Sequence, residues 1–353
     1  MKFLICSNNI NSFSKILAQG LKRKLNEHDI QSEINYSGLD ILSYNIKTSK
    51  GVILIWVLYS LSRFFVSILK YDVIVIVSNI PTAFLKNEFV NIEKLRKIFP
   101  KKIFVCYMNY YLPTRGPWEA WLKEGNKDKG VPIKNNYGLE RYDWYLASSL
   151  VSEFPLKKEF HPVSHIGLNL SSSDDLYSEK KDEFIALVDF ERSDHMQERL
   201  IQLRALEELG IEYIVLNGSY TIDKIRSIYR KVSIYFVAHR ESFGLPICEI
   251  QACGAYVFTP YSNWCPSHWK KERLDKDGEG VLGGNFIIYE NDIELLKQKI
   301  IELKKRYNSI EVRNRFIDEY PEYYFANNIE ISNFLDKIKN NEINSGSHSR
   351  YIK

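Results

Sequence analysis

The sequence predicts an α/β protein built from two doubly wound domains. Three observations predict it: short apolar runs without strict alternation, helical apolar patterns between those runs, and a polar break that separates two such series. Apolar strands without alternation are typical of parallel sheets, which are buried on both faces. With 353 residues, 45% of them hydrophobic, the chain is long enough for two domains with a core each.

The first series occupies residues 1–170. We expect strands at 3–6, 73–77, 103–107 and 145–147, and a helix at 13–26 with an apolar stripe. The first apolar run stops at polar residues directly after Cys6, so it is predicted to be a strand and not a signal peptide. The most apolar stretch, 52–69, carries Arg63 near its centre, which favours a packed or membrane-touching helix over a spanning one.

The second series follows the polar residues 171–175. We expect strands at 184–188, 213–216, 234–237 and 256–258, and helices at about 197–209, 222–230, 246–253 and 291–307. The predicted organisation is an N-terminal domain over 1–170, a C-terminal domain over 171–320, a last helix over 321–340 and a frayed tail over 341–353. Ligands of doubly wound domains bind outside the carboxyl ends of the strands, so the loops there are the candidate sites.

Charge is divided unevenly along the chain. Residues 1–170 hold 23 Lys and Arg against 14 Asp and Glu, and the remainder holds 25 against 30. A basic first domain indicates an anionic surface such as lipid, with ordinary charge scatter as an equal alternative. Basic residues are dispersed and no reader motif occurs, so we expect no nucleic-acid partner. The five cysteines form no CxxC pair, which fits a reducing cytoplasm.

The most informative segment covers residues 240–254 and reads R-E-S-F-G-L-P-I-C-E-I-Q-A-C-G. A predicted strand ends shortly before it, Pro246 suits the first position of a helix, and Gly254 suits the end of one. Free backbone N–H groups and the dipole at such a helix start favour an anion such as a phosphate. Glu241 and Glu249 lie on either side and can accept hydrogen bonds from sugar hydroxyls. A nucleotide sugar combines these groups.

This segment resembles the Glu–seven residues–Glu motif of retaining glycosyltransferases with the two-domain GT-B fold (family 4-like). The resemblance extends more weakly over most of residues 140–305, and the first 140 residues match in pattern only. It implies two Rossmann-like doubly wound domains facing a cleft, with the last helix crossing back to the N-terminal domain.

The resemblance also implies roles for individual residues. The expected catalytic residues are Glu241, His239 and Arg192, although His239 is equally well explained as a structural residue. The expected donor-binding residues are Arg240, Ser242, Phe243, Gly244, Leu245, Pro246, Glu249, Asn217 and Gly218, of which Glu249 would bind the ribose. The acceptor site is expected on other grounds, because aromatic rings stack on sugars and Arg115 can hold an anion. Its expected residues are Asn109, Tyr110, Tyr111, Arg115 and Trp118, and the alternative for this aromatic region is a hydrophobic lid.

The sequence departs from that family where the diphosphate is usually neutralised. Asp189 and Phe190 stand in place of the usual Gly-Arg pair, and the Lys that follows is absent. Arg192, Arg199 or Arg240 are the candidate cations, since charge that develops on the departing phosphate needs stabilisation. A donor with one phosphate, such as a CMP-sugar, and a catalytically inactive relative both remain open.

A metal or cofactor is not expected. Asp275 and Asp277 form an Asp-x-Asp pair, but they lie in a polar Gly-rich stretch and do not follow an apolar strand. His, Cys and Asp show no metal-ligand spacing, and no dinucleotide or P-loop motif occurs. The nucleotide sugar would therefore be a substrate of a metal-independent enzyme.

The predicted function is that of a retaining hexosyltransferase. It would move a sugar from a nucleotide-sugar donor to a glycan or lipid-linked acceptor. Its place would be the cytoplasm or the inner face of the cytoplasmic membrane, and the Asn-, Lys- and Ile-rich composition suggests bacterial lipopolysaccharide or capsule synthesis. The alternatives are a nucleotide-sugar epimerase, an inverting transferase and a non-catalytic sugar- or partner-binding subunit with the same fold.

Overall fold

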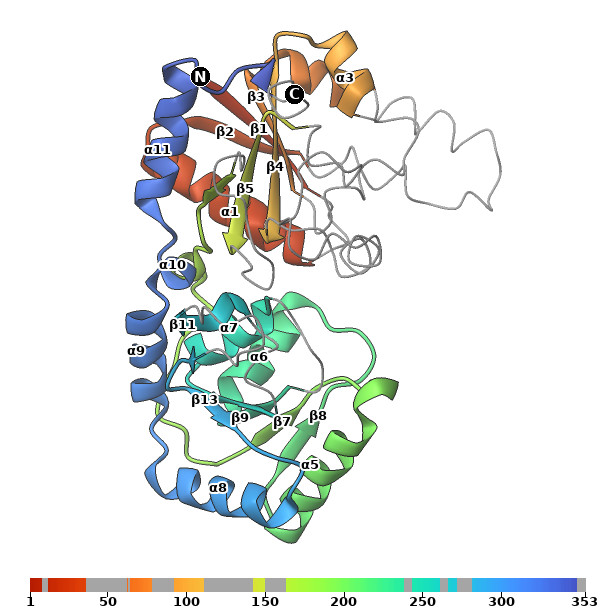
Figure 1. Ribbon diagram of the computed structural model, residues 1–353, viewed down its shortest axis with the longest axis vertical. Helices are drawn as coiled ribbons and strands as arrows, with labels where there is room; N and C mark the ends of the chain where they lie inside the picture. The colour runs from red at the N-terminus through yellow and green to blue at the C-terminus, as the bar shows by residue number, and fades with distance from the viewer. Residues whose placement is uncertain are drawn as a thin grey trace, which may run out of the picture. The chain divides into compact units, whose positions relative to one another are not determined.

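The computed structural model divides the chain into two units, which we call unit 1 and unit 2 (Figure 1). Unit 1 comprises Met1–Asn169 and Ala326–Lys353, and unit 2 comprises Leu170–Phe325. The structure describes residues 1–7, 12–35, 62, 64–77, 92–110, 142–149, 163–237, 243–260, 266–271 and 281–347.

Unit 1 is built on a six-stranded parallel sheet of order β2-β1-β3-β4-β5-β6. The strands are β1 (Lys2–Cys6), β2 (Gln31–Asn35), β3 (Val73–Val77), β4 (Ile103–Tyr110), β5 (Trp144–Ser149) and β6 (Val163–His165). All five residues of β3, a V-I-V-I-V run, are buried. This burial on both faces is the reason why the run lacks a polar alternation.

The helices of unit 1 include α1 (Ser12–Glu27), α3 (Ile92–Ile98) and α11 (Asn328–Lys339). The chain returns to unit 1 at Ala326, and α11 packs there through an edge-to-face pair between Phe334 and Phe3. The tail expected over 341–353 is packed at its start: Ile343 is buried, and Arg96 donates a hydrogen bond to the carbonyl of Ser345 at 3.1 Å. The prediction of a frayed tail is wrong for residues 341–347, because Ile343 follows polar residues and one apolar residue in a polar stretch gives no sequence signal of packing.

Unit 2 contains a five-stranded parallel sheet of order β13-β10-β9-β7-β8. Its strands are β7 (Ala186–Val188), β8 (Tyr213–Val215), β9 (Ile234–Phe236), β10 (Tyr256–Thr259) and β13 (Phe286–Ile288), and a separate antiparallel pair joins β11 (Trp269–Lys271) to β12 (Val281–Leu282). The strand that follows β7 lies on one side of it, and β9 lies on the other. This reversal creates a topological switch point at the carboxyl ends of β7 and β9.

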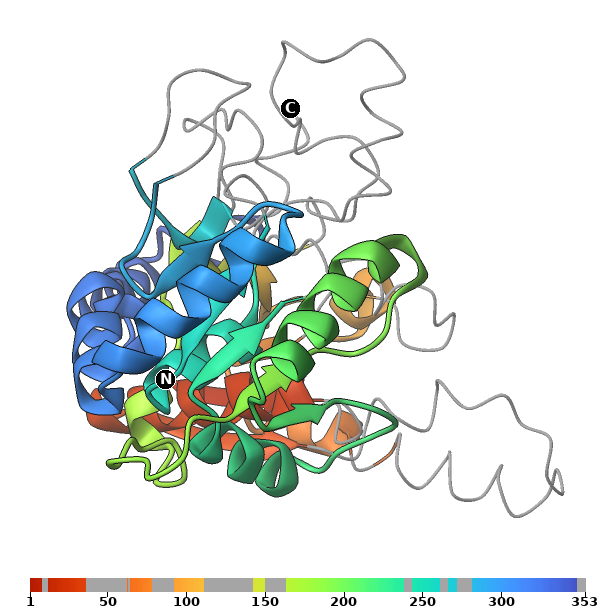
Figure 2. The same ribbon diagram turned by 90° about the horizontal axis from the view of Figure 1, so that it is seen from below.

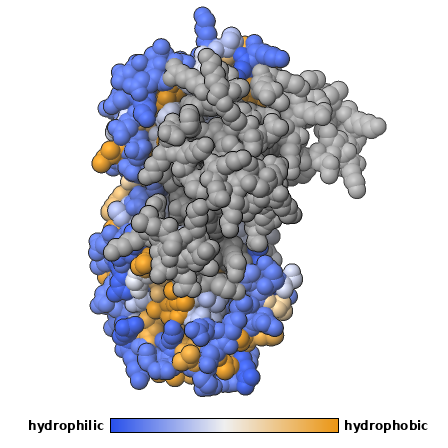
Figure 3. Space-filling model, in the orientation of Figure 1, coloured by the Kyte–Doolittle hydropathy of each residue, from blue (hydrophilic) through white to orange (hydrophobic). Residues whose placement is uncertain are grey.

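The helices of unit 2 cover both faces of this sheet (Figures 1 and 2). They are α5 (Met196–Glu208), α6 (Ile222–Lys231), α7 (Leu245–Ala252), α8 (Ile293–Arg306), α9 (Ser309–Glu319) and α10 (Pro321–Tyr324). α5 connects β7 to β8 in one direction along the sheet, and α6 and α7 connect β8 to β9 and β9 to β10 in the other. Right-handed crossovers therefore put α5 on one face and α6 and α7 on the other. Apolar side chains are exposed over α5 and α8, including Leu200 and Leu295 (Figure 3).

Candidate functional site

The candidate site lies in unit 2, where α7 begins beside the switch point. Gly244 has extended backbone angles and is the N-cap of α7, and Pro246 occupies the first turn. Leu245 is the first helical residue, so Pro246 is one position further into the helix than the sequence predicted. Phe243 and Leu245 are buried, which fixes the direction in which the chain enters the helix. The unsatisfied N–H groups and the dipole of α7 therefore favour an anion at this edge of the sheet.

The end of α7 is as well defined as its start. Gly254 adopts a φ of +82°, and the N–H of Ala255 donates to the carbonyl of Ile250 at 3.1 Å. The N–H of Gly254 donates to Gln251 at 2.9 Å, which completes a Schellman motif. A side chain at Gly254 would approach the carbonyl of Ser309 to 2.5 Å. The glycine predicted to stop the helix is therefore required both by its backbone angle and by its neighbour on α9.

Glu249 of α7 is buried and paired with Arg226 of α6. Arg226 donates to the Oε1 atom of Glu249 from Nε at 3.0 Å and also from one terminal nitrogen, and its other terminal nitrogen donates to Oδ1 of Asp175 at 2.8 Å. Burial raises the pKa of Glu249, and the Arg226 charge opposes that increase. The two hydrogen bonds from Arg226 thus hold the buried carboxyl group in one orientation. The sequence did not indicate Arg226 or Asp175, because no local pattern marks their contact with Glu249.

Two of the candidate cations have different surroundings. Arg192 is exposed, directly before a short 3-10 helix (Ser193–His195) that leads into α5. Arg199 is buried and donates to the main-chain carbonyl of Asp189, so its charge stabilises the loop and does not face solvent. The carboxylate of Asp189 is buried at the end of β7 and accepts a hydrogen bond from the N–H of Phe190 at 2.8 Å. The resemblance implies a cation at this position, and the structure has the buried side chain of Asp189 there instead.

Asn217 and Gly218 follow β8 at the same edge of the sheet. Gly218 is exposed with a φ of +67°, and the N–H of Asn217 donates to the hydroxyl of Tyr220 at 3.2 Å. The Tyr220 ring packs edge-on against Phe190, with ring centroids 6.1 Å apart. The loops after β7 and β8 are thus in contact.

Several predicted site residues are not among those that the structure describes. Glu241, His239, Arg240 and Ser242 of the motif lie outside the described residues, and so do the acceptor candidates Tyr111, Arg115 and Trp118. Asn109 and Tyr110 are the last two residues of β4 in unit 1. The roles predicted for these residues stay predictions.

Two solved structures match nearly the whole chain. A Listeria monocytogenes protein assigned as a UDP-N-acetylglucosamine 2-epimerase is 13% identical, with a TM-score of 0.56 over 96% of this chain and 95% of its own. The catalytic domain of starch synthase IV from Arabidopsis thaliana, bound to ADP and acarbose, is 10% identical, with a TM-score of 0.51 over 99% of each chain. No protein-family model and no curated protein matches the sequence.

The chain has the GT-B fold. The prediction of two Rossmann-like domains is confirmed, whereas identities of this size show the fold and nothing about the reaction. In the described part of the chain, no three His, Cys, Asp or Glu side chains gather as metal ligands. No described helix combines the length and apolar character needed to cross a membrane.

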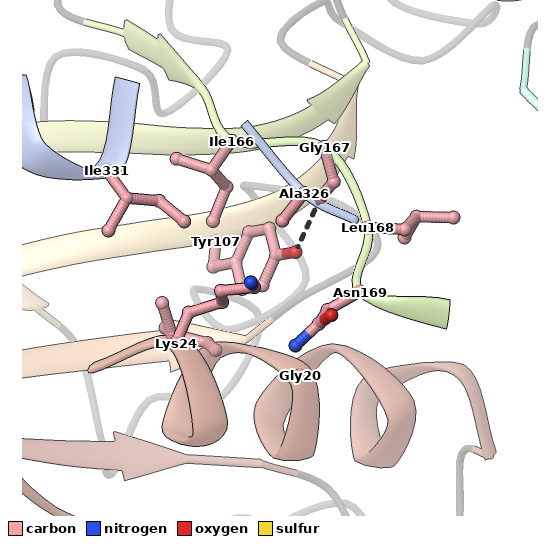
Figure 4. Close-up of a pocket in the computed structure, with 10 residues that line it drawn as sticks. Gly20, Lys24, Tyr107, Ile166, Gly167, Leu168, Asn169, Ala326 and Ile331 are labelled. Atoms are coloured by element: carbon pink, nitrogen blue, oxygen red, sulfur yellow. Dashed lines mark hydrogen bonds between the residues drawn. The ribbon is translucent and has the colours of Figure 1, made fainter. Parts of the chain in front are cut away.

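Unit 1 of this GT-B chain contains a small, open hollow between α1, β4 and the start of α11 (Figure 4). Tyr107 directs its hydroxyl to the carbonyl of Gly167 at 3.1 Å, and Lys24 pairs with Glu27 at 2.8 Å.

The start of α7 in this GT-B chain rests on a cluster of rings. His268 stacks on Phe243 with centroids 5.8 Å apart and ring planes 3° apart, and the rings of Phe286, Tyr320 and Tyr323 surround it. His268 is fully buried, and neither of its ring nitrogens has a hydrogen-bond partner among the described residues. Burial lowers the pKa of His268 to about 3, so the imidazole is neutral.

We expect the free energy of unfolding to fall as the pH drops below about 6.5. The unfolded chain binds a proton at His268 in this range and the folded protein does not, because its pKa is about 3. One such proton corresponds to about 1.4 kcal/mol per pH unit. Urea unfolding at pH 7, 6 and 5 measures how the free energy of unfolding changes with pH. His268→Phe removes the contribution of His268 to this change, and His28→Phe is the control. Equal slopes for wild type and His268→Phe would contradict it.

Arg226→Met leaves the carboxylate of Glu249 buried without its counter-charge. Breaking a buried pair in this way costs about 3–5 kcal/mol of unfolding free energy. The control is Arg204→Met, which removes an exposed pair with Glu208 and costs roughly 0.2–1 kcal/mol. Urea unfolding measures both variants, and a similar small loss in each would show that Arg226 is not the main partner of Glu249.

Proposed function

We propose that the protein is a glycosyltransferase that moves a sugar from a nucleotide-sugar donor to a glycan or lipid-linked acceptor with retention of configuration. The observation that carries the proposal is the start of α7 at the switch point, with the Glu249 carboxylate held by Arg226. This site offers an anion-binding helix start and an oriented acceptor for hydroxyl groups. Starch synthase IV, which has the same fold, is bound to ADP and acarbose, a nucleotide and a sugar.

In the proposed reaction, the bond between the anomeric carbon and the phosphate oxygen breaks, and a bond to the acceptor oxygen forms on the same face of the sugar. The proton of the acceptor hydroxyl passes to the departing phosphate oxygen. Glu241 and the amides at the start of α7 orient the sugar, Glu249 anchors the ribose, and His239 approaches the sugar. Arg192 or Arg240 stabilises the negative charge on the phosphate. The step needs no metal ion.

The wider proposal places the protein in the cytoplasm of a bacterium, in the synthesis of lipopolysaccharide or capsule. The acceptor would contact Asn109, Tyr110, Tyr111, Arg115 and Trp118. Aromatic rings stack on sugar rings, and Arg115 suits an acceptor with a negative charge.

Glu241→Gln should lower sugar transfer about 10- to 150-fold while the fold persists, because a hydrogen bond from a sugar hydroxyl to a charged group contributes about 1.5–3 kcal/mol. Nucleotide binding is first measured by thermal unfolding with UDP, GDP, ADP, TDP and CMP, and transfer is then assayed with sugars carried by the nucleotides that bind. A ligand at about 100 times its dissociation constant stabilises the protein by roughly 2.7 kcal/mol. The matched control is Glu311→Gln, an exposed glutamate of α9. Wild-type transfer by Glu241→Gln would refute the assignment.

The second candidate function is a nucleotide-sugar epimerase, which the likeness to the Listeria monocytogenes protein favours. Incubation with the donor alone separates the two candidates. An epimerase produces free epimer without any acceptor, and a transferase requires one. No turnover with any donor would favour a non-catalytic sugar- or partner-binding subunit.

Unit 1 would meet an anionic membrane through a surface that we call the apolar–basic patch, formed by Val66, Leu69, Ile98, Lys70, Lys97 and Lys101. The three apolar side chains are 52%, 63% and 57% exposed. The two segments that carry them are adjacent, since the rings of Phe65 and Phe99 lie 5.8 Å apart. Exposed apolar side chains beside lysines suit a lipid surface with negative head groups.

Replacing Leu69 and Ile98 together by Ser should weaken vesicle binding about tenfold or more, because the apolar area that enters the lipid is lost. Cosedimentation with vesicles rich in phosphatidylglycerol measures the binding, and pure phosphatidylcholine vesicles test the charge requirement. Ile329→Ser is the control, since Ile329 is 74% exposed on α11, away from the patch. Unchanged binding by the double variant would disprove the membrane contact.

A further inference from the structure

The loops after β7 and β8 bring two aromatic rings together at the edge of the unit 2 sheet. Phe190 follows β7 and Tyr220 precedes α6, and their rings meet edge-on with centroids 6.1 Å apart. We call Phe190, Tyr220, Asn217 and Lys224 the aromatic corner. The hydroxyl of Tyr220 bonds both the N–H and the side chain of Asn217, at 3.2 and 3.4 Å, which fixes the ring.

Phe190 is unusual among the phenylalanines of unit 2 that surround this sheet. It is 38% exposed, whereas Phe236 and Phe258 of the neighbouring strands are fully buried. The ring of Phe190 therefore contributes little to the core and presents apolar surface beside the switch point. A surface of this kind at the carboxyl edge of a doubly wound sheet is where a ligand is expected.

Positive charge accompanies the rings. The ammonium group of Lys224 lies 5.4 Å from the centre of the Tyr220 ring, and Arg192 is exposed two residues after Phe190. Asp223 and Asp194 are also exposed nearby in the sequence, so the corner is not strongly basic. The ligand that fits is flat and aromatic, with a limited negative charge attached.

We propose that the aromatic corner is the stacking site for the base of the nucleotide donor, with Phe190 as the ring on which the base lies. The inference rests on the proposed function and assigns the base of the donor to the Phe190 ring, for which the sequence indicated no binding role. Stacking of a base on an aromatic side chain contributes roughly 1–3 kcal/mol and tolerates any base, because every base has a π face. Recognition by stacking therefore predicts similar affinities for UDP, GDP and ADP, within about tenfold of one another.

The test compares ligands with and without a base by calorimetry. Phe190→Leu keeps an apolar side chain and removes the ring, so UDP binding should weaken about 5- to 150-fold. Binding of ribose 5-phosphate, which has no base, should stay at the wild-type level. Phe190→Ala provides a second variant with the same expected pattern, and circular dichroism shows that each variant is folded.

A further variant serves as the control. Tyr177→Ala removes an exposed tyrosine of unit 2 whose ring, like that of Tyr220, has a cation near it. The guanidinium carbon of Arg230 lies 5.2 Å from the centre of the Tyr177 ring. Tyr177 is outside the corner, and its loss should leave UDP binding unchanged.

The outcomes separate this inference from the proposed function. Equal weakening of UDP and ribose 5-phosphate, or wild-type UDP binding by both Phe190 variants, overturns the stacking site. If Glu249→Gln abolishes UDP binding while the Phe190 variants bind UDP like wild type, the proposed nucleotide site at α7 is supported. The placement of the base on Phe190 is then wrong. If wild type binds no nucleotide, both the stacking site and the proposed function are overturned.

Discussion

The guanidinium group of Arg226 joins three segments of unit 2 that are far apart in the sequence. It binds Asp175, just after the chain enters the unit, and Glu249 in the middle of α7. Taking these charges out of water is costly, and the cost is offset only when all the partners are in place. The segment around Asp175 is further held by Arg230, which donates to its carbonyl at 2.8 Å. The position of α7, and with it the candidate site, therefore depends on arginines that contact no ligand in this arrangement.

The same helix is fixed at both ends by contacts of a different kind. At its start, Phe243 lies against His268 and Tyr323, so the entering loop is held by ring packing. At its end, Arg313 of α9 donates to the carbonyl of Ala252 at 2.8 Å, next to the Schellman motif. An anion-binding helix start is useful only if its N–H groups keep their direction when the ligand is absent, because ordering them during binding would lower the affinity. Rings at one end and an arginine at the other supply this rigidity.

The accuracy of the sequence predictions follows from the range of the interactions involved. Buried parallel strands such as β3 and the helix α7 were predictable because continuous apolar runs and terminal Pro and Gly residues are local signals. The pair between Arg226 and Glu249 was not, since it depends on how α6 packs on α7. Nothing in the sequence distinguishes Arg199 from the other polar residues of its helix. Only the fold shows that its guanidinium group is buried and donates to the main-chain carbonyl of Asp189. Glu241 is not among the residues that the structure describes, so its expected role stays a prediction.

The charges at the sheet edge indicate how a nucleotide would gain its affinity. The buried side chain of Asp189 lies directly after β7, so this position supplies no positive charge for a phosphate. Arg192 and Lys224 are exposed, so salt screens their attraction for the phosphate. The α7 dipole adds roughly half a charge. In the proposed nucleotide site, phosphate contacts would therefore supply little of the binding energy. The larger share would come from the proposed stacking of the base on Phe190 and the proposed contact of Glu249 with the ribose hydroxyls.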